Sequence, residues 1–244
     1  MREGEFNDPR LVKLYDLECP WSVDDDFFLS VINEAPVSRV LDLGCGTGRL
    51  ATGIAAAGHT ITGVDPAKAS LDEAQSKPGA ENVTWIEGTS TVLPDAAFDV
   101  AVMTSHVAQF FTDDEHFSNT LKDLKRALVP GGRLIFDSRD PAYRRWDCWN
   151  PVDSRHRVRL EDDTDVDIWT EVTAVRGDIV DFTHRYVWPT GEELTSTASL
   201  RFRTETALRN SLNDAGFIIE NIYGGWHRQP VGEGDGEFLV IAHA

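Results

Sequence analysis

Three glycines at alternate positions, Gly44, Gly46 and Gly48, are the residues of this chain that point most directly to chemistry. They follow the apolar run at 40–43 and precede a segment whose apolar residues have helical spacing. Glycine has no Cβ, so such a turn can take positive φ and let the backbone approach a ligand closely. Because open α/β sheets bind nucleotides at the carboxyl ends of their parallel strands, the first hypothesis is a nucleotide or nucleoside site.

Two further side chains could belong to the same site. Asp65 ends the next predicted strand, 60–64, and a carboxylate there can accept hydrogen bonds from both hydroxyls of a ribose. It could instead only cap the helix that begins behind Pro66. His106 follows the fourth predicted strand, 98–103, and its intrinsic pKa suits proton transfer near neutrality. A histidine that merely bonds the loop backbone is the competing interpretation.

The order of the predicted elements explains how these residues would meet. Strands and helices alternate as far as residue 136, which is typical of a parallel, doubly wound sheet. Within this part, Thr112 and Glu115 predict a capping box, and the Pro130-Gly131-Gly132 cluster predicts a break before the fifth strand at 133–136.

The pattern changes after residue 140. Apolar and polar residues alternate in runs at 166–175, 179–188 and 194–202, as half-buried antiparallel strands require. We predict a core formed by 1–140 and 201–244, with 1–23 as an amino-terminal lid and 141–200 as an inserted antiparallel sheet over the substrate.

Composition excludes several classes of function. The net charge of −18 and the pI near 4.6 would repel a polyanion, so we expect no nucleic acid partner. We find no signal-peptide pattern and no apolar run of about 18 residues, so we expect no membrane insertion. The three cysteines, Cys19, Cys45 and Cys148, have unrelated spacings, which indicates a reduced, cytoplasmic protein. Monomer and homodimer both remain open.

Five motifs, taken in order, resemble those of the class I S-adenosylmethionine (SAM)-dependent methyltransferases, and most narrowly a bacterial group that acts on small molecules. They read VLDLGCGTG at 40–48, GVDP at 63–66, EGT at 87–89, FDVAVM at 98–103 and LVPGGRL at 128–134. The resemblance implies a Rossmann-like, doubly wound, seven-stranded sheet whose last strand is antiparallel. It covers most of the chain.

The resemblance also implies roles for single residues. The cofactor loop would be Gly44, Cys45, Gly46, Thr47 and Gly48. Asp42 would help to hold the methionine ammonium, Asp65 would bind the ribose, Thr89 and Ser90 would border the adenine with Pro66 against its face, and Thr104 would lie beside the methionine end. Tyr15 and Trp21 could close over the sulfonium, since an aromatic face attracts a cation, or could simply pack the lid.

Methyl transfer from a sulfonium is an in-line displacement that alignment and exclusion of water can largely drive. We therefore expect transfer to an oxygen or nitrogen of a small molecule, with S-adenosylhomocysteine as the other product and His106 as a possible base. Asp137 and Asp140 suggest a metal site, but without an evident third ligand we expect no metal. A non-catalytic SAM- or nucleoside-binding regulator is the alternative, whereas an NAD-dependent oxidoreductase conflicts with the G-x-G-x-G spacing.

Overall fold

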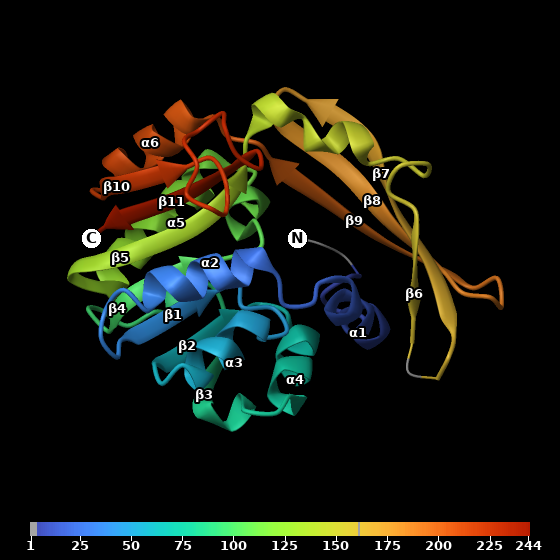
Figure 1. Cartoon of the computed structure of the whole chain (residues 1–244), viewed down its shortest axis with the longest axis horizontal. Coiled ribbons are helices and arrows are strands. Elements are labelled where there is room, and N and C mark those ends of the chain that lie inside the picture. Colours follow the sequence, from blue (N-terminus) through green and yellow to red (C-terminus); the bar gives the residue numbers. More distant parts are fainter. Residues whose placement is uncertain (1–3, 161) are drawn as a thin grey trace.

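The computed structural model describes residues 4–160 and 162–244, which form two sheets (Figure 1). The larger sheet has seven strands in the order β10-β11-β5-β4-β1-β2-β3. Its strands are β1 (Arg39–Leu43), β2 (Thr60–Asp65), β3 (Val83–Glu87), β4 (Phe98–Met103), β5 (Leu128–Arg139), β10 (Ile218–Tyr223) and β11 (Glu237–His243). The first five are parallel, and β11 runs antiparallel to both β5 and β10. The predicted fold class is confirmed.

Helices cover both faces of this sheet because its buried strands are apolar on both sides. On one face, β1 and β5 place Leu41 and Phe136 in a core with the helices α5 and α6, and on the other they place Val40 and Ile135 in a core with α2 and α3. The helices are α1 (Pro9–Glu18), α2 (Val23–Ile32), α3 (Arg49–Ala56), α4 (Lys68–Ser76), α5 (Asp114–Ala127) and α6 (Glu205–Asp214). Short 3₁₀ turns are η1 (Ala80–Asn82), η2 (Ser90–Val92), η3 (Val107–Phe110), η4 (Pro141–Tyr143) and η5 (Arg145–Cys148).

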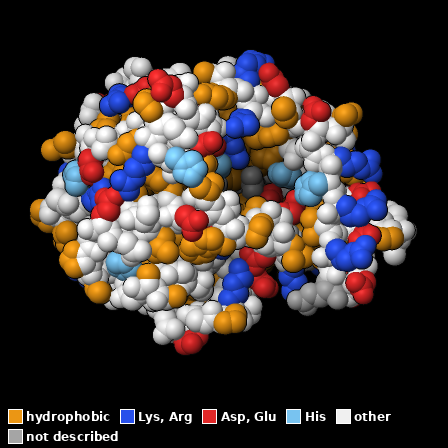
Figure 2. Space-filling view, in the orientation of Figure 1, with side chains coloured by type: hydrophobic (Ala, Val, Ile, Leu, Met, Phe, Trp, Pro, Cys, Tyr) orange, Lys and Arg blue, Asp and Glu red, His pale blue; other side chains and the backbone are white. Residues whose placement is uncertain are grey.

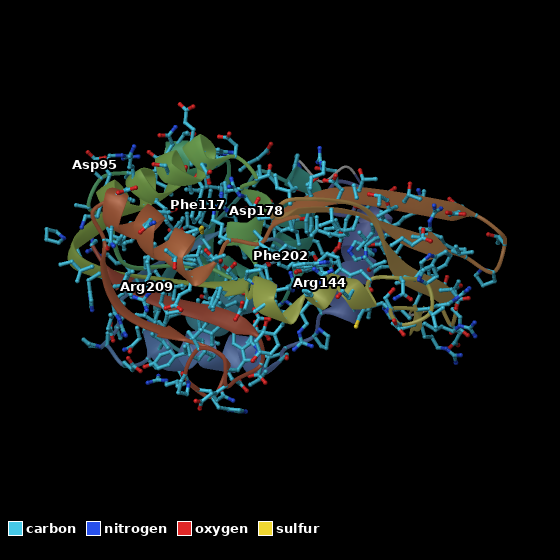
Figure 3. All side chains as sticks on the ribbon, turned by 90° about the horizontal axis from the view of Figure 1, so that it is seen from above. Asp95, Phe117, Arg144, Asp178, Phe202 and Arg209 are labelled. Carbon is cyan, nitrogen blue, oxygen red and sulfur yellow. The ribbon has the colours of Figure 1, made fainter. Side chains whose placement is uncertain are left out.

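The smaller sheet is an antiparallel meander that arches away from the core (Figure 1). Its strands are β6 (His156–Arg159), β7 (Asp165–Arg176), β8 (Ile179–Val187) and β9 (Glu193–Arg201). One end of its inner face packs Ile168 and Tyr186 against Leu11 and Leu14 of α1. At the other end the sheet meets the core beside Phe202, which contacts the Trp146 ring at 4.4 Å between centroids and is labelled in Figure 3.

The segment before α1 links the two sheets. The backbone N–H of Glu5 donates to Ser196 Oγ on β9 at 3.2 Å, and Ser70 Oγ on α4 donates to the carbonyl of Phe6 at 3.2 Å. Residues 4–23 thus cross between the meander and the core, where the sequence predicted a lid; residues 1–3 of that lid lie outside the described part. Among the described residues, every helix is too short or too polar to cross a bilayer.

Two local predictions were wrong. Helix α5 begins one residue later than the capping box predicted, because Asp113 is its N-cap residue and the Asp113 side chain accepts from the His116 N–H at 2.8 Å. Strand β5 begins at Leu128 and continues through the predicted break, where Gly131 N–H donates to the carbonyl of Ala244 at 2.9 Å. Hydrogen bonds to Ala244, at the far end of the chain, thus keep the strand continuous at the glycines.

Candidate functional site

The glycine loop joins β1 to α3, and its three glycines have φ of +81°, +52° and +75°. A Cβ at Gly44 would lie 2.7 Å from Val107 Cγ2, and one at Gly48 would collide with the Trp85 ring. Those two glycines are therefore required by packing. At Gly46, by contrast, a Cβ would have no neighbour within 4 Å. The middle of the loop is where a ligand can approach the backbone.

Asp65, at the end of β2, holds this loop in place. Its Oδ2 accepts from the Gly46 N–H at 2.9 Å and its Oδ1 accepts from the Ala67 N–H at 2.8 Å. The carboxyl is buried, which raises its pKa. Helix α4 begins at Lys68 with Ala67 at its N-cap position and no side-chain cap, so the bond from Ala67 to Asp65 closes the turn before the helix and does not cap it. Pro66 beside it is exposed.

Asp42 lies on β1, two residues before Gly44, the first glycine of the loop, and its side chain is buried, with 1% of the residue exposed. Within the described residues its Oδ1 has no hydrogen-bond partner. Burial, together with the negative charge of Asp65, raises its pKa to about 7. A buried carboxyl with an unsatisfied oxygen is costly, so this position favours a ligand that brings a positive charge or an N–H donor.

The amino-terminal helix reaches the loop through Thr47, whose hydroxyl donates to Asp16, and Asp16 also pairs with Lys77 Nζ at 2.6 Å. Tyr15 is half-buried with its ring 5.6 Å from that of Phe6. Trp21 donates its Nε1–H to Asp26 at 2.7 Å and covers Gly53 on α3. This placement favours the packing interpretation of Trp21.

The remaining predicted cofactor residues lie on neighbouring loops. Ser90 is buried and donates its hydroxyl to Asp123 Oδ2 at 2.7 Å on α5, whereas Thr89 is exposed. Thr104 is half-buried after β4, and its carbonyl accepts from the Val107 N–H at 3.2 Å. Cys45 is buried in the loop, and burial raises the pKa of its thiol.

The next loop, after β4, carries His106 in a constrained conformation. Ser105 and His106 have φ of +53° and +64°, which are uncommon for residues with a Cβ and often mark functional sites. Asp137 Oδ2 accepts from the His106 backbone N–H at 3.0 Å. The imidazole Nε2 lies 3.2 Å from the same Asp137 oxygen and 3.0 Å from Glu237 Oε2.

The sheet itself brings these carboxyls together. Asp137 and Arg139 are two residues apart on β5, and Glu237 on β11 lies opposite Arg139, so all three belong to one face. Burial raises the pKa of Asp137 to about 6 and that of Glu237 to about 7, while His106 opposes the first shift and Arg139 the second. We refer to His106, Asp137 and Glu237 as the carboxylate–histidine cluster.

This cluster changes the metal hypothesis drawn from the sequence. Asp140 does not join Asp137; it caps η4 by accepting from the Ala142 N–H at 2.8 Å. The cluster's own ligand atoms all lie within 4.8 Å of one another. Such a set could hold a divalent cation or share protons through its hydrogen bonds.

A cavity of about 140 Å³ opens beside His106, between the carboxyl edge of the large sheet and the inner face of the meander. Figure 2 shows the molecule hollowed between the two sheets, with histidine side chains nearby. The core contributes Ser105, His106, Phe110 and Arg139, and the inserted segment contributes Trp149, Thr170, Phe182, His184, with Leu200. The sequence analysis identified His106 but missed Arg139, His184 and Glu237. The signals that could have found them are the position of Arg139 and Glu237 at strand ends and the position of His184 on the inner face of the predicted meander.

Residues 40–132 match the family of methyltransferase domains. The chain is 36% identical over 104 residues to the cypemycin N-terminal methyltransferase of a Streptomyces species, which is 42% of either chain. It is 31% identical over 132 residues to the malonyl-[acyl-carrier protein] O-methyltransferase of Pseudescherichia vulneris, covering 53% of this chain and 51% of that protein. The chain thus spans about half the length of the curated relatives it matches.

Solved structures resemble the whole fold. The CcbJ methyltransferase from Streptomyces caelestis has a TM-score of 0.76 at 19% identity, with 96% of both chains covered. A SAM-bound amino pentose methyltransferase from Micromonospora echinaspora, involved in calicheamicin biosynthesis, has a TM-score of 0.73 at 20% identity, with 95% of this chain and 94% of that chain covered. At these identities the likeness concerns the fold.

Proposed function

We propose that this chain, which belongs to the class I SAM-dependent methyltransferases, transfers a methyl group from SAM to an oxygen or nitrogen atom of a small molecule and releases S-adenosylhomocysteine. The observation that best supports the proposal is the contact between the glycine loop and the His106 loop, where Val107 packs on Gly44. The first loop has the open side of Gly46 and the second lines the cavity, so a cofactor and an acceptor would bind next to each other.

The cofactor residues remain those that the sequence predicted. The unsatisfied buried carboxyl of Asp42 supports a contact with the methionine ammonium, and the open side of Gly46 supports a close approach of the cofactor to the loop. Asp65 would bind the ribose from the place where it already orients Gly46. The other proposed cofactor contacts are Tyr15, Gly44, Cys45, Thr47, Gly48, Pro66, Thr89, Ser90 and Thr104, whereas Trp21 packs over Gly53 instead.

Bound SAM supplies a methyl group on a positively charged sulfur. The acceptor's lone pair forms a bond to the methyl carbon as the carbon–sulfur bond breaks, and the sulfur keeps that electron pair as a neutral thioether. A hydroxyl or ammonium acceptor must also lose a proton. The chain contributes alignment, a cavity beneath the meander, and a group that takes this proton.

We propose that His106 accepts the proton that the methyl acceptor loses. Its Nε2 lies against two carboxyls, an arrangement that orients an imidazole and stabilises its protonated form. The proton from the acceptor would then be taken by the imidazole. Since hydrogen bonds already hold Asp137 and Glu237 against the His106 imidazole, we propose that methyl transfer needs no metal.

We also propose that the protein acts in the cytoplasm on a small-molecule partner, without nucleic acid or membrane, as a monomer or homodimer. The net charge of −18 argues against a polyanionic partner, and the three cysteines are free thiols in the described structure.

Two measurements test the proposal. Titration calorimetry with SAM, S-adenosylhomocysteine and NAD should show binding of the first two and none of NAD. Incubation with methyl-labelled SAM and a small-molecule extract should then yield labelled product. Absence of SAM binding would refute the proposal, and tight SAM binding without any label transfer would identify a non-catalytic regulator instead.

A further inference from the structure

Helix α1 lies between the core and the meander and contacts both (Figure 1). Leu11, Leu14 and Glu18 are three and four residues apart, so they share one face of the helix. The two leucines pack on the meander, and Glu18 Oε1 lies 2.8 Å from His156 Nε2 on β6. Asp16 is two residues from Leu14 and from Glu18, so it projects from roughly the opposite side of the helix, toward the core.

Asp16 binds the middle of the glycine loop. Thr47, which is 2% exposed, donates its hydroxyl to Asp16 Oδ1, and Lys77 Nζ lies 2.6 Å from Asp16 Oδ2. A hydrogen bond to an ionised carboxylate is roughly twice as strong as one between neutral groups. Because Asp65 holds the neighbouring Gly46 N–H from β2, two carboxylates on different elements fix this short loop. A ligand that orders the loop therefore also stabilises the position of α1.

The contacts of α1 with the core differ in kind from its contacts with the meander. Its buried leucines belong to the apolar cluster of the meander. At its carboxyl end the bonds to the core are polar, since Arg49 of α3 donates to the carbonyls of Cys19 and Pro20 at 2.5 and 3.3 Å. A cavity of about 340 Å³ at this junction is lined in part by Asp16, Arg49 and Lys77. Polar contacts around open space separate at lower cost than an apolar core, so we expect α1 to stay with the meander when its bond to the loop breaks.

The length of α1 makes it depend on both neighbours. It has 10 residues, and isolated helices shorter than about 12 to 15 residues are marginal in water. Contacts on one side alone therefore leave it less ordered than contacts on both sides. A ligand that strengthens one set of contacts thus strengthens the other, and the effect is reciprocal because both sets belong to one equilibrium.

We propose that Asp16 is a positioning residue for the cofactor loop, and that through it α1 couples cofactor binding to the order of the meander over the acceptor cavity. The inference rests on the proposed function, because it takes SAM or S-adenosylhomocysteine as the ligand of the glycine loop. The meander is then held more firmly above the acceptor cavity with the cofactor bound than without it.

Hydrogen exchange of the full chain, with and without S-adenosylhomocysteine, tests this coupling. We expect the ligand to slow exchange in the loop at 44–48 and, about fivefold, at the backbone amides of 156–159 and 165–168. These strand segments of β6 and β7 contact α1 and lie outside the described lining of the cavity at His106. In Asp16→Ala the ligand should still protect the loop but should no longer protect these strand amides.

Three further variants separate this role from a general effect on stability. Asp16→Asn keeps an acceptor for the Thr47 hydroxyl without the charge, so it should restore part of the strand protection. Thr47→Val removes the donor of the same bond and nearly preserves the side chain's shape, so it should act like Asp16→Ala and serves as the test if that variant does not fold. Asp72→Ala is the control, because it removes an exposed acid whose partner is Lys68, and the coupling should persist.

Protection of the loop alone in the parent would overturn the inference and leave the proposed function intact. Strand protection that persists in both Asp16→Ala and Thr47→Val, or that disappears in Asp72→Ala, would overturn it as well. Absence of S-adenosylhomocysteine binding by the parent, measured by calorimetry, would refute the proposed function and the inference with it.

Discussion

The two halves of the large sheet's carboxyl edge assemble their candidate functional residues over very different distances in sequence. On the side of β1 and β2, Asp42, the glycine loop and Asp65 all come from one strand–loop–helix–strand unit, and Asp65 bonds Gly46 across 19 positions. On the side of β4, β5 and β11, His106 bonds Asp137 across 31 positions and Glu237 across 131.

The two halves also differ in what holds them. The proposed cofactor side, at β1 and β2, is held by backbone: by positive φ at three glycines and by N–H groups bound to Asp65. The proposed acceptor side, at β4, β5 and β11, is held by side chains that the sheet register and the meander bring together. We therefore expect changes on the acceptor side to alter turnover, and changes on the cofactor side to alter SAM binding.

The largest effect is expected from His106→Ala. If His106 takes the proton, turnover should fall roughly 100-fold, as losing a general base typically costs, while SAM affinity stays within about threefold. Label transfer and calorimetry measure the two quantities. His227→Ala, on an exposed loop, is the control and should change neither.

Because His106 has a positive φ that alanine disfavours, His106→Asn is a second variant that tolerates this backbone. An unaltered rate in both would remove His106 from the mechanism. A large loss of SAM affinity in both variants would contradict the expectation that changes near His106 alter turnover and leave SAM binding intact.

Asp42→Asn tests what the buried carboxyl on the proposed cofactor side costs in stability. The pKa of Asp42 is raised from 3.8 unfolded to about 7 folded, so the folded state holds an extra proton between these values and stability falls as pH rises through that window. From pH 5 to pH 8 the parent should therefore lose about 2 to 3 kcal/mol more unfolding free energy than the variant.

Urea unfolding at the two pH values measures this difference. Asp99→Asn is the control, since the pKa of Asp99 is lowered by its bond to Arg39, and its removal should not flatten the pH dependence. If the parent and the variant lost the same unfolding free energy between pH 5 and pH 8, the pKa of Asp42 would not be raised in the folded state.

Gly46→Ala should weaken SAM roughly tenfold, because the new methyl group would occupy the open side of the loop. Gly58→Ala is a matched control, with φ of +93° and nothing within 4 Å of its Cβ position. Both should lose about 1 kcal/mol of stability from strain, as thermal unfolding reports. Equal SAM affinities in the two variants would mean that the cofactor does not approach the loop at Gly46.

The smallest effect is expected from metal removal. Treatment with a chelator should change the rate of methyl transfer by less than about twofold, because hydrogen bonds already hold the carboxylate–histidine cluster. Activity that disappears and returns with magnesium or manganese would instead make this cluster a metal site, and would transfer the role of His106 from base to ligand.

The sequence was sufficient for the elements that rest on local signals. The strand at 98–103 has the predicted bounds, and the predicted strands at 166–175 and 179–188 agree with β7 and β8 to within one residue at each end. One prediction failed where a distant partner decided the outcome, since β5 continues through its glycines because the carboxyl terminus pairs with them. The other failed locally, because Asp113 caps α5 in place of its neighbour Thr112.

What the sequence determined by itself is the doubly wound fold and the glycine loop, because both depend on apolar periodicity and on backbone conformations that only glycine adopts freely. What only the tertiary structure decided is the acceptor side. Sheet register placed Glu237 opposite Arg139, and the meander placed His184 across the cavity from them. No local pattern encodes these contacts, because each depends on long-range pairing whose energy is realised only when the whole sheet has formed.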